Sequence, residues 1–139
     1  LIPANGFYEW AHEEKRKIPH LIERKDHRVF AMAGLWETYS DPNGSEIDTA
    51  TIITTDANGT VSALHNRMPV ILSEDDFDLW LRSEATPFDD AMALLKPAPD
   101  DLLDLRPFDP RTGPIEIKAT PAEKPKRKKD SSDGQASLF

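Results

Sequence analysis

Cysteine is missing from all 139 residues, which excludes disulfides, thiolate metal sites and a thiol nucleophile within this sequence. Glycine is scarce, with six residues against twelve prolines, so we expect many turns and few long helices. No apolar run approaches the ~18 residues that a transmembrane helix needs, and no membrane partner is therefore expected. The sequence also lacks a glycine-rich phosphate loop and a Gly-x-Ser-x-Gly nucleophile elbow.

The length and composition are those of one globular domain rather than of a multidomain protein. Of the 139 residues, 38% are hydrophobic and 30% are charged, so the chain can build one modest core. It begins with Leu1 instead of Met, in an apolar stretch that lacks the charged region of a signal peptide. We therefore expect the sequence to be part of a longer protein.

Charge is distributed unevenly along the chain, whose net charge is −8. Residues 74–110 contain eleven Asp/Glu and three Lys/Arg between apolar side chains, as on the solvated face of amphipathic helices. From residue 121 onward five Lys/Arg stand against three acids, with a basic run at 124–129. We expect residues 114–139 to be a disordered basic tail. The acidic body argues against a broad, nonspecific nucleic-acid surface but is compatible with a locally basic groove.

Hydrophobic periodicity predicts an α+β fold with a mostly antiparallel sheet and two peripheral helices late in the chain. The helices are expected over residues 74–83, with Ser73 as N-cap, and over residues 88–95. Turns are expected at Asn5-Gly6, with positive φ, at Lys25-Asp26, pairing the strands on either side, and at residues 41–44. The expected strands are residues 1–3, 7–10, 19–24, 28–36, 49–55 and 68–72, with a charged turn at 11–17 and a loop or short helix at 56–64.

Glu9 is the first candidate for chemistry. It lies between Tyr8 and Trp10 in an otherwise apolar strand, and a period of two puts it on the same face as Phe7. Loss of water at that face would favour the protonated carboxyl and suit it to proton transfer near neutral pH. The alternative is a carboxylate at a sheet edge that is exposed to water.

His65 and Arg67 are the second and third candidates. His65 stands where an irregular segment gives way to a strand, and such loop ends often carry catalytic groups. The alternative for His65 is a structural, hydrogen-bonded histidine. Arg67 has the geometry to clamp a phosphate, or to pair with one of the many acids.

The other three histidines do not predict a metal site. His12, His20 and His27 are separated by eight and seven residues, which does not match compact zinc-ligand spacing, and no cysteine assists them. We expect no metal and no organic cofactor.

Four motifs occur in order at residues 1–10 (LIPANGFYEW), 34–37 (GLWE), 52–58 (IITTDAN) and 65–72 (HNRMPVIL). Together they resemble the later half of an SRAP domain, the family of SOS-response-associated peptidases and abasic-site processing proteins. The resemblance covers roughly residues 1–105. It implies that residues 1–113 are the C-terminal part of a barrel-like α+β SRAP fold whose N-terminal part is missing.

The resemblance also implies a function. Members of the family recognise abasic sites in single-stranded DNA and link to them covalently. The family's nucleophile is an N-terminal cysteine, exposed when the protein removes its own initiator Met. Its amine and thiol capture the opened sugar as an imine and then as a thiazolidine.

The resemblance assigns roles to five residues of this chain. Glu9 and His65 match the family's active-site glutamate and histidine, which assist Met removal and the proton transfers of ring opening and linkage. Thr54 and Arg67 match positions that line the DNA-binding groove. Trp10 is placed beside the glutamate or against a base. A cytoplasmic, nucleoid-associated location follows from this role.

Two departures from the family pattern limit these implications. The N-terminal cysteine, the arginines that follow it and an active-site asparagine belong to the part that is not in this sequence, so residues 1–139 by themselves cannot form the thiazolidine. Residues 106–119 lack the asparagine-containing stretch that usually precedes the final strand, which leaves the closing of the sheet open.

The last five residues resemble the short Gln-x-x-Leu-Phe peptides that dock on the bacterial sliding clamp. Leu138 and Phe139 would enter an apolar pocket while Gln135 makes a polar contact. A flexible tether with terminal anchors binds weakly and reversibly. The alternative is a tail that only adds solubility.

Three functional interpretations therefore stand at this point. The first is a DNA repair protein that captures abasic sites, using Glu9 and His65. The second is a module that binds single strands or the clamp without chemistry. The third is an inactive fragment, because part of its sheet is absent.

Overall fold

The computed structural model describes residues 1–13, 16–82 and 84–115, and within these residues the chain forms short strands and two short helices. The expected tail at residues 114–139 lies almost entirely outside the described residues. The final strand, β11 (Gly113–Pro114), spans the expected boundary at residue 113. Within the described ranges, no helix is long and apolar enough to cross a membrane.

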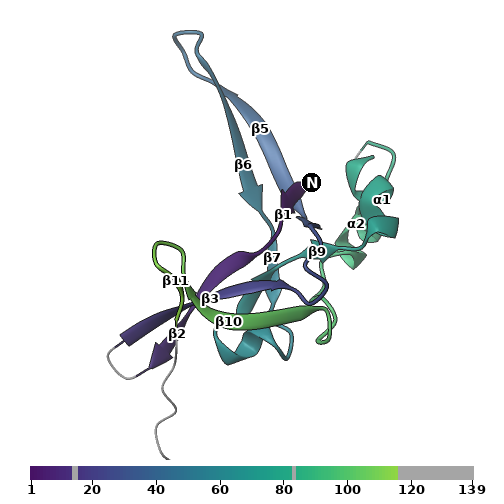
Figure 1. Cartoon of the computed structure of the whole chain (residues 1–139). Helices are drawn as coiled ribbons and strands as arrows, with labels where there is room; N and C mark the ends of the chain where they lie inside the picture. The colour runs from purple at the N-terminus through teal and green to yellow at the C-terminus, as the bar shows by residue number, and fades with distance from the viewer. Residues whose placement is uncertain (14–15, 83, 116–139) are drawn as a thin grey trace, which may run out of the picture.

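The strands of the described residues form four antiparallel sheets, of which the β5-β6 hairpin stands out in Figure 1. One sheet has the order β1-β4-β9 and a second the order β11-β10-β3-β2, while β5 pairs with β6 and β7 pairs with β8. The bounds not yet given are β1 (Ile2–Ala4), β2 (Phe7–Glu13), β3 (Arg16–Arg24), β4 (Phe30–Met32), β5 (Gly34–Ser40), β6 (Glu46–Ile52), β7 (Thr54–Asp56), β8 (Arg67–Pro69), β9 (Ile71–Leu72) and β10 (Leu103–Asp109).

Three strand-to-strand junctions meet in a closed ring of backbone hydrogen bonds. Ala33 lies between β4 and β5, Ile53 between β6 and β7, and Val70 between β8 and β9. The N–H of Ala33 donates to the carbonyl of Val70, that of Val70 to Ile53, and that of Ile53 to Ala33, each at 2.9 Å. Ala33 and Val70 are fully buried. The ring is the point where three strand pairs leave in different directions.

This ring explains why three expected strands are split. Segments 28–36, 49–55 and 68–72 are predicted as continuous strands, but each is interrupted at its ring residue and changes partner there. Residues before Ile53 pair with β5 and those after it with β8, while β9 beyond Val70 pairs with β4. Propensity predicts extended backbone at these positions but contains no information about which partner each half takes.

Two apolar clusters hold the sheets together. The first cluster packs the β2-β3-β10 face against the segment around the 3₁₀ turn Val61–Ala63. Its buried members are Ile22, Val61, Met68, Ala98 and Leu103. The second cluster joins the ring to the helices, and its buried members are Ala33, Val70, Leu72 and Leu94.

Two predicted turns differ from the structure. Asn5-Gly6 separates β1 from β2, which pair with β4 and β3 and not with each other. Gly6 does not have positive φ; a Cβ there would lie 2.9 Å from the Ile22 carbonyl oxygen, so close backbone approach is what requires glycine. Lys25-Asp26 does not pair its flanking strands either, because β3 lies between β2 and β10.

The other predictions for turns and strands agree with the structure in part. The turn at 41–44 is confirmed as the tip of the β5-β6 hairpin, where Gly44 has φ of 87°. The charged turn at 11–17 is shorter than predicted, because β2 continues to Glu13 and β3 begins at Arg16. Strand β10, which the sequence left open, pairs with β3 over five residues. The sheets do not join into a closed barrel among the described residues, which corrects the barrel-like expectation.

Both predicted helices exist but are short: α1 spans Phe77–Leu81, after the 3₁₀ turn Glu74–Asp76, and α2 spans Phe88–Ala93. Ser73 is the N-cap residue of this 3₁₀ turn, as predicted, but its side chain makes no capping hydrogen bond to a backbone N–H. Its hydroxyl donates to the Asp76 carboxylate at 2.8 Å instead of accepting a backbone N–H. The α+β class with a mostly antiparallel sheet is confirmed.

The backbone ring generates a prediction for native-state hydrogen exchange. We expect the amides of Ala33, Ile53 and Val70 to share one slow exchange class, because each is buried in the same closed arrangement and opens only when the sheets separate. The amides of Thr38 and Tyr39, in the exposed hairpin, should exchange faster. NMR-detected exchange checks this, and a ring amide exchanging as fast as the hairpin would contradict it.

Candidate functional site

Glu9 lies in β2 directly opposite His20 of β3. Cross-strand partners point to the same face, and their Cβ atoms are about 4.5–5.5 Å apart in antiparallel pairs. His20 is only 6% exposed, and its Nδ1 lies 3.0 Å from the carbonyl oxygen of Ile18. Donation to that carbonyl leaves a lone pair on Nε2, on the face that carries Glu9. The sequence analysis treated His20 only as a poor metal ligand, and the strand register is what reveals its position.

His65 follows the 3₁₀ turn and is exposed at the start of β8. Its Nδ1 lies 3.0 Å from the backbone N–H of Arg67 and 3.1 Å from the carbonyl oxygen of the same residue. Nδ1 therefore has a backbone partner whether or not it carries a proton. Without a proton it accepts from the N–H of Arg67, and with one it donates to the carbonyl. Nε2 is the nitrogen left for an incoming group.

Arg67 and Thr54 are brought together, as expected for two residues of one groove. The Nη2 of Arg67 donates to the carbonyl of Thr54 at 2.6 Å and to its hydroxyl at 3.0 Å. Nη1 donates to the carboxylate of Asp56 at 3.2 Å. This surface ion pair is worth at most about 1 kcal/mol, so an incoming phosphate can replace Asp56 at low cost.

Glu9 lies in β2 and His65 in the segment before β8, and neighbours of both residues pack against the same apolar cluster. Phe7, two residues before Glu9 on the same strand face, packs against the first cluster, and so does Leu64, immediately before His65. No hydrogen bond or ion pair joins Glu9 to His65 within the described part of the chain. Trp10, the next residue of β2, is partly exposed. The cluster is the physical link between the two halves of the candidate site.

Asn58 anchors the segment that presents His65, a role that the sequence analysis missed. Its side chain is buried and donates to the carbonyls of Ala98 and Pro99 at 3.0 and 3.2 Å. Its Oδ1 accepts the N–H of Val61 at 2.9 Å. A buried amide with all three partners on backbone fixes a loop in one conformation. Nothing in the polar segment around Asn58 indicates from sequence that its side chain is buried.

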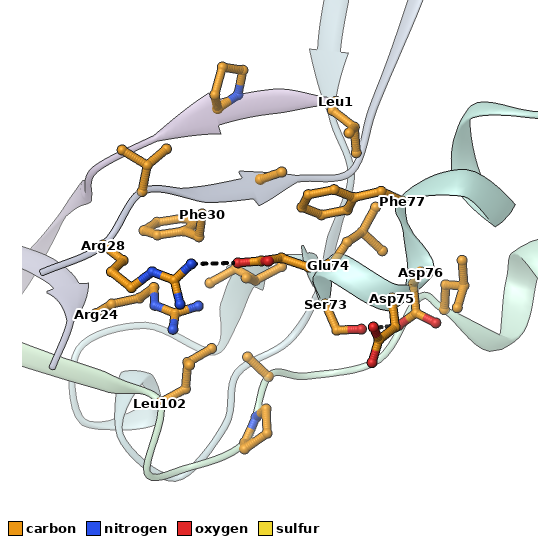
Figure 2. Close-up of a pocket in the computed structure, with 18 of the residues that line it drawn as sticks. Leu1, Arg24, Arg28, Phe30, Ser73, Glu74, Asp75, Asp76, Phe77 and Leu102 are labelled. Atoms are coloured by element: carbon orange, nitrogen blue, oxygen red, sulfur yellow. Dashed lines mark hydrogen bonds and ion pairs between the residues drawn. The ribbon is translucent and has the colours of Figure 1, made fainter. Parts of the chain in front are cut away.

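Two grooves on the surface of the described residues are lined by neither Glu9 nor His65. The larger, of about 970 Å³, runs between the β1-β4-β9 sheet and the segment around Pro97, and neither Glu9 nor His65 lines it. Figure 2 shows the Arg28–Glu74 ion pair inside it, at 3.0 Å. Arg24, also in this groove, holds Asp26 bidentately, which lowers the pKa of that carboxyl far below its usual range. Both guanidinium groups thus already have carboxylate partners.

The second groove, of about 610 Å³, lies between the start of the β5-β6 hairpin and the two helices. Six of its residues define what we call the hairpin groove: Leu35, Trp36, Trp80, Leu81, Phe88 and Met92. The indole N–H of Trp80 donates to the carbonyl of Gly34 at 3.3 Å and ties α1 to β5. Across the described residues, no three His, Asp or Glu side chains are grouped so as to hold a metal ion.

Comparison with known proteins gives the family. The signature described as SOS response associated peptidase (SRAP) matches residues 1–114. The chain belongs to the SRAP family. The protein named abasic site processing protein YoqW, from Bacillus subtilis, is 43% identical over 98 residues, which cover 70% of this chain and 44% of that protein. The protein named abasic site processing protein HMCES, from Gallus gallus, is 36% identical over 118 residues, covering 70% of this chain and 35% of its own length.

Comparison with solved structures supports the same fold. A crystal structure of a protein from Bacteroides thetaiotaomicron superimposes with a TM-score of 0.73 at 34% identity, covering 78% of this chain and 48% of that one. A protein from Bordetella bronchiseptica superimposes with a TM-score of 0.68 at 28% identity, covering 84% of this chain and 54% of its own. The chain thus spans about half the length of these SRAP relatives or less.

The buried amide of Asn58 generates a stability prediction. Asn58→Ala should lower the free energy of unfolding by about 2 kcal/mol, because two buried carbonyls and one N–H lose their partner. Asn58→Asp should cost at least as much, since a carboxylate cannot donate to Ala98 and Pro99. Urea unfolding measures both variants. Ser62→Ala on the same loop is the control, and an Asn58→Ala value within about 0.5 kcal/mol of wild type would contradict the anchoring role.

Proposed function

We propose that this protein contributes the general acid–base half of an SRAP site that processes abasic sites in single-stranded DNA. The observation that carries the proposal is that Phe7 and Leu64, neighbours of Glu9 and His65, pack against one apolar cluster in a chain whose relatives are named abasic site processing proteins. The Arg67–Thr54 contact supports a neighbouring surface for the DNA backbone.

The proposed chemistry divides into steps that each need a proton carrier. The ring-opened sugar offers an aldehyde, a neutral amine adds to its carbon, and loss of water then gives an imine. A thiolate closes the thiazolidine by adding to the imine carbon while the nitrogen takes up a proton. Glu9 and His65 serve as the acid and base of these transfers and of the self-cleavage that frees the amine. Residues 1–139 contain no cysteine, so the amine and thiol must come from outside this sequence.

DNA recognition is assigned to the exposed surface beside His65. Arg67 exchanges Asp56 for a phosphate and keeps its contacts with Thr54, which hold the guanidinium in place. Trp10 offers a partly exposed indole on which an unstacked base can lie. An abasic site in single-stranded DNA, which is already unstacked, is the substrate that fits these two contacts. A cytoplasmic, nucleoid-associated location follows.

The decisive experiment uses a chimera in which residues 1–114 replace the matched segment of Bacillus subtilis YoqW, so that the remainder of an SRAP domain is present. Incubation with single-stranded DNA carrying an abasic site should give a covalent product on a denaturing gel. Glu9→Gln and His65→Ala should each slow its formation about 10²–10⁴-fold, the usual range for removing a general acid or base.

Matched controls keep this test specific. Glu37→Gln changes an exposed carboxylate on the hairpin and His12→Ala an exposed histidine of β2, and both should leave the rate unchanged. Unchanged rates for Glu9→Gln and His65→Ala would refute the site assignment. Tight DNA binding with no covalent product in any chimera would favour the alternative of a binding module without chemistry.

We further propose that the C-terminal residues dock on the bacterial sliding clamp. Support comes only from the sequence: Gln135, Leu138 and Phe139 reproduce the pattern of clamp-binding peptides and lie outside the described residues. Placed after a basic run, such a peptide would bring the protein to DNA under synthesis.

Deleting residues 135–139 should abolish retention of this chain on immobilised sliding clamp, measured by pull-down. Leu138→Ala with Phe139→Ala should do the same, since the apolar anchors supply most of the contact. Ser137→Ala is the control within the same peptide. Equal retention of the deleted and intact chains would end this proposal.

A further inference from the structure

His20 is a buried ionisable side chain that the proposed chemistry does not use. It is 6% exposed, and alternation along β3 puts it on the same sheet face as Ile22, a member of the first apolar cluster. His20 and Asn58 are the buried polar residues of the described chain, and the amide of Asn58 has backbone partners. Buried polar atoms normally have hydrogen-bond partners, so partners are expected for both ring nitrogens of His20 as well.

One ring nitrogen of His20 has such a partner. Nδ1 lies 3.0 Å from the carbonyl oxygen of Ile18. A carbonyl only accepts, so Nδ1 carries a proton and, in the neutral ring, Nε2 has a lone pair. Among the described residues Nε2 has no hydrogen-bond partner, and no polar side-chain atom there is both enclosed and unpartnered. Nε2 is therefore accessible to a neighbouring side chain.

Glu9 is the ionisable side chain placed to meet Nε2. It lies directly opposite His20 on β2 and is half-buried, and the Cβ atoms of such pairs are about 4.5–5.5 Å apart. On the other side of His20, β10 places Pro107, which has no ionisable group. Asp109, the next residue on that face of β10, already accepts the backbone N–H of Arg111 at 2.8 Å. Rotation about the side-chain bonds of Glu9 lets its carboxyl reach Nε2 across the strand pair.

We propose that His20 is a positioning residue for Glu9, whose carboxyl it holds in one orientation by a hydrogen bond at Nε2 across the β2-β3 pair. The bond places the carboxyl on the sheet face that borders the first apolar cluster, the face to which Ile22 and Phe7 also belong. The contact of Nδ1 with the Ile18 carbonyl fixes the ring, so the position of Nε2 is fixed as well. This inference rests on the proposed function, because it adds a residue to the same site.

The hydrogen bond matters because Glu9 moves a proton twice in the proposed chemistry. Its carboxylate takes a proton from the nitrogen that has added to the aldehyde, and later gives that proton to the leaving hydroxyl, which departs as water. Between the two transfers the carboxyl O–H donates to Nε2 of His20. If the proton crosses to the ring, Nε2–H donates to the carboxylate instead. In both states the carboxyl stays in place until the second transfer, which avoids the cost of reorienting it.

The test uses the chimera of residues 1–114 in Bacillus subtilis YoqW, with the rate of covalent product measured over a range of concentrations of abasic single-stranded DNA. His20→Phe keeps an aromatic ring without nitrogen and should lower the maximal rate at least about tenfold. The DNA concentration for half-maximal rate should change less than about threefold, because the role proposed for His20 involves no DNA contact. His20→Gln should restore the maximal rate to within about threefold of wild type, since an amide accepts from the acid and donates to the carboxylate.

A second measurement detects the contact without any activity. Long-range ¹H–¹⁵N NMR of the labelled chimera should show His20 with its proton on Nδ1. Glu9→Gln should change the ¹⁵N chemical shift of Nε2, and Glu37→Gln, on the exposed hairpin, should leave it unchanged. His12→Phe makes the same replacement at an exposed histidine of β2 and is the matched control for the rates. Thermal unfolding followed by circular dichroism shows whether each variant is folded.

The outcomes separate this inference from the proposed function. A wild-type rate in His20→Phe while Glu9→Gln remains slow would overturn the inference and leave the proposed function standing. Equal losses in the folded Phe and Gln variants would also overturn it, because a positioning hydrogen bond is available to Gln. An unchanged rate in Glu9→Gln would refute the proposed function and, with it, the role of His20.

Discussion

The backbone ring of Ala33, Ile53 and Val70 is the constraint on which the rest of the structure depends. Three hydrogen bonds of 2.9 Å close on themselves, and each ring residue is the point where one strand ends and another begins. The three ring residues lie between strands, where neither neighbouring sheet supplies an acceptor for their N–H groups. The ring provides that acceptor for each of them. Small Ala33 lets the three backbones approach, and the second apolar cluster, which contains Val70, excludes water from them. The ring therefore sets the directions of the β1-β4-β9 sheet, the β5-β6 hairpin and the β7-β8 ribbon.

The candidate site follows from that geometry. The β7-β8 ribbon carries Thr54 and Arg67 on its exposed face and ends in the segment that presents His65, while Met68 on its other face enters the first apolar cluster. Glu9 arrives from a different sheet and meets the same cluster through Phe7. The two halves of the proposed acid–base pair are thus positioned by packing, not by a direct bond between them. A core change at Ile22 or Met68 should accordingly disturb the site as well as stability.

Sequence reasoning recovered what depends on local pattern and missed what depends on partners. Most strands and both helices were predicted, because alternation and capping residues are local signals. The splits at Ala33, Ile53 and Val70 and the placement of β3 between β2 and β10 were not predicted, because strand partners are chosen by long-range packing. Glu9, His65 and Arg67 are predicted as site residues from residue type and context alone. His20 and Asn58 were missed, since one is identified by register and the other by buried carbonyls forty residues away in sequence.

Two regions of the described surface differ in polarity and charge. Around His65 and Arg67 the surface is polar, and its one guanidinium is held by an exposed, replaceable carboxylate, which suits a charged substrate that comes and goes. Around the hairpin groove the surface is apolar and acidic, and the edges of β5 and β6 pair with no other described strand. The two surfaces meet at the backbone ring, since Ile53 lines the hairpin groove and leads directly into Thr54. Packing at the groove is therefore coupled through the ring to the ribbon that carries Arg67 and leads to His65.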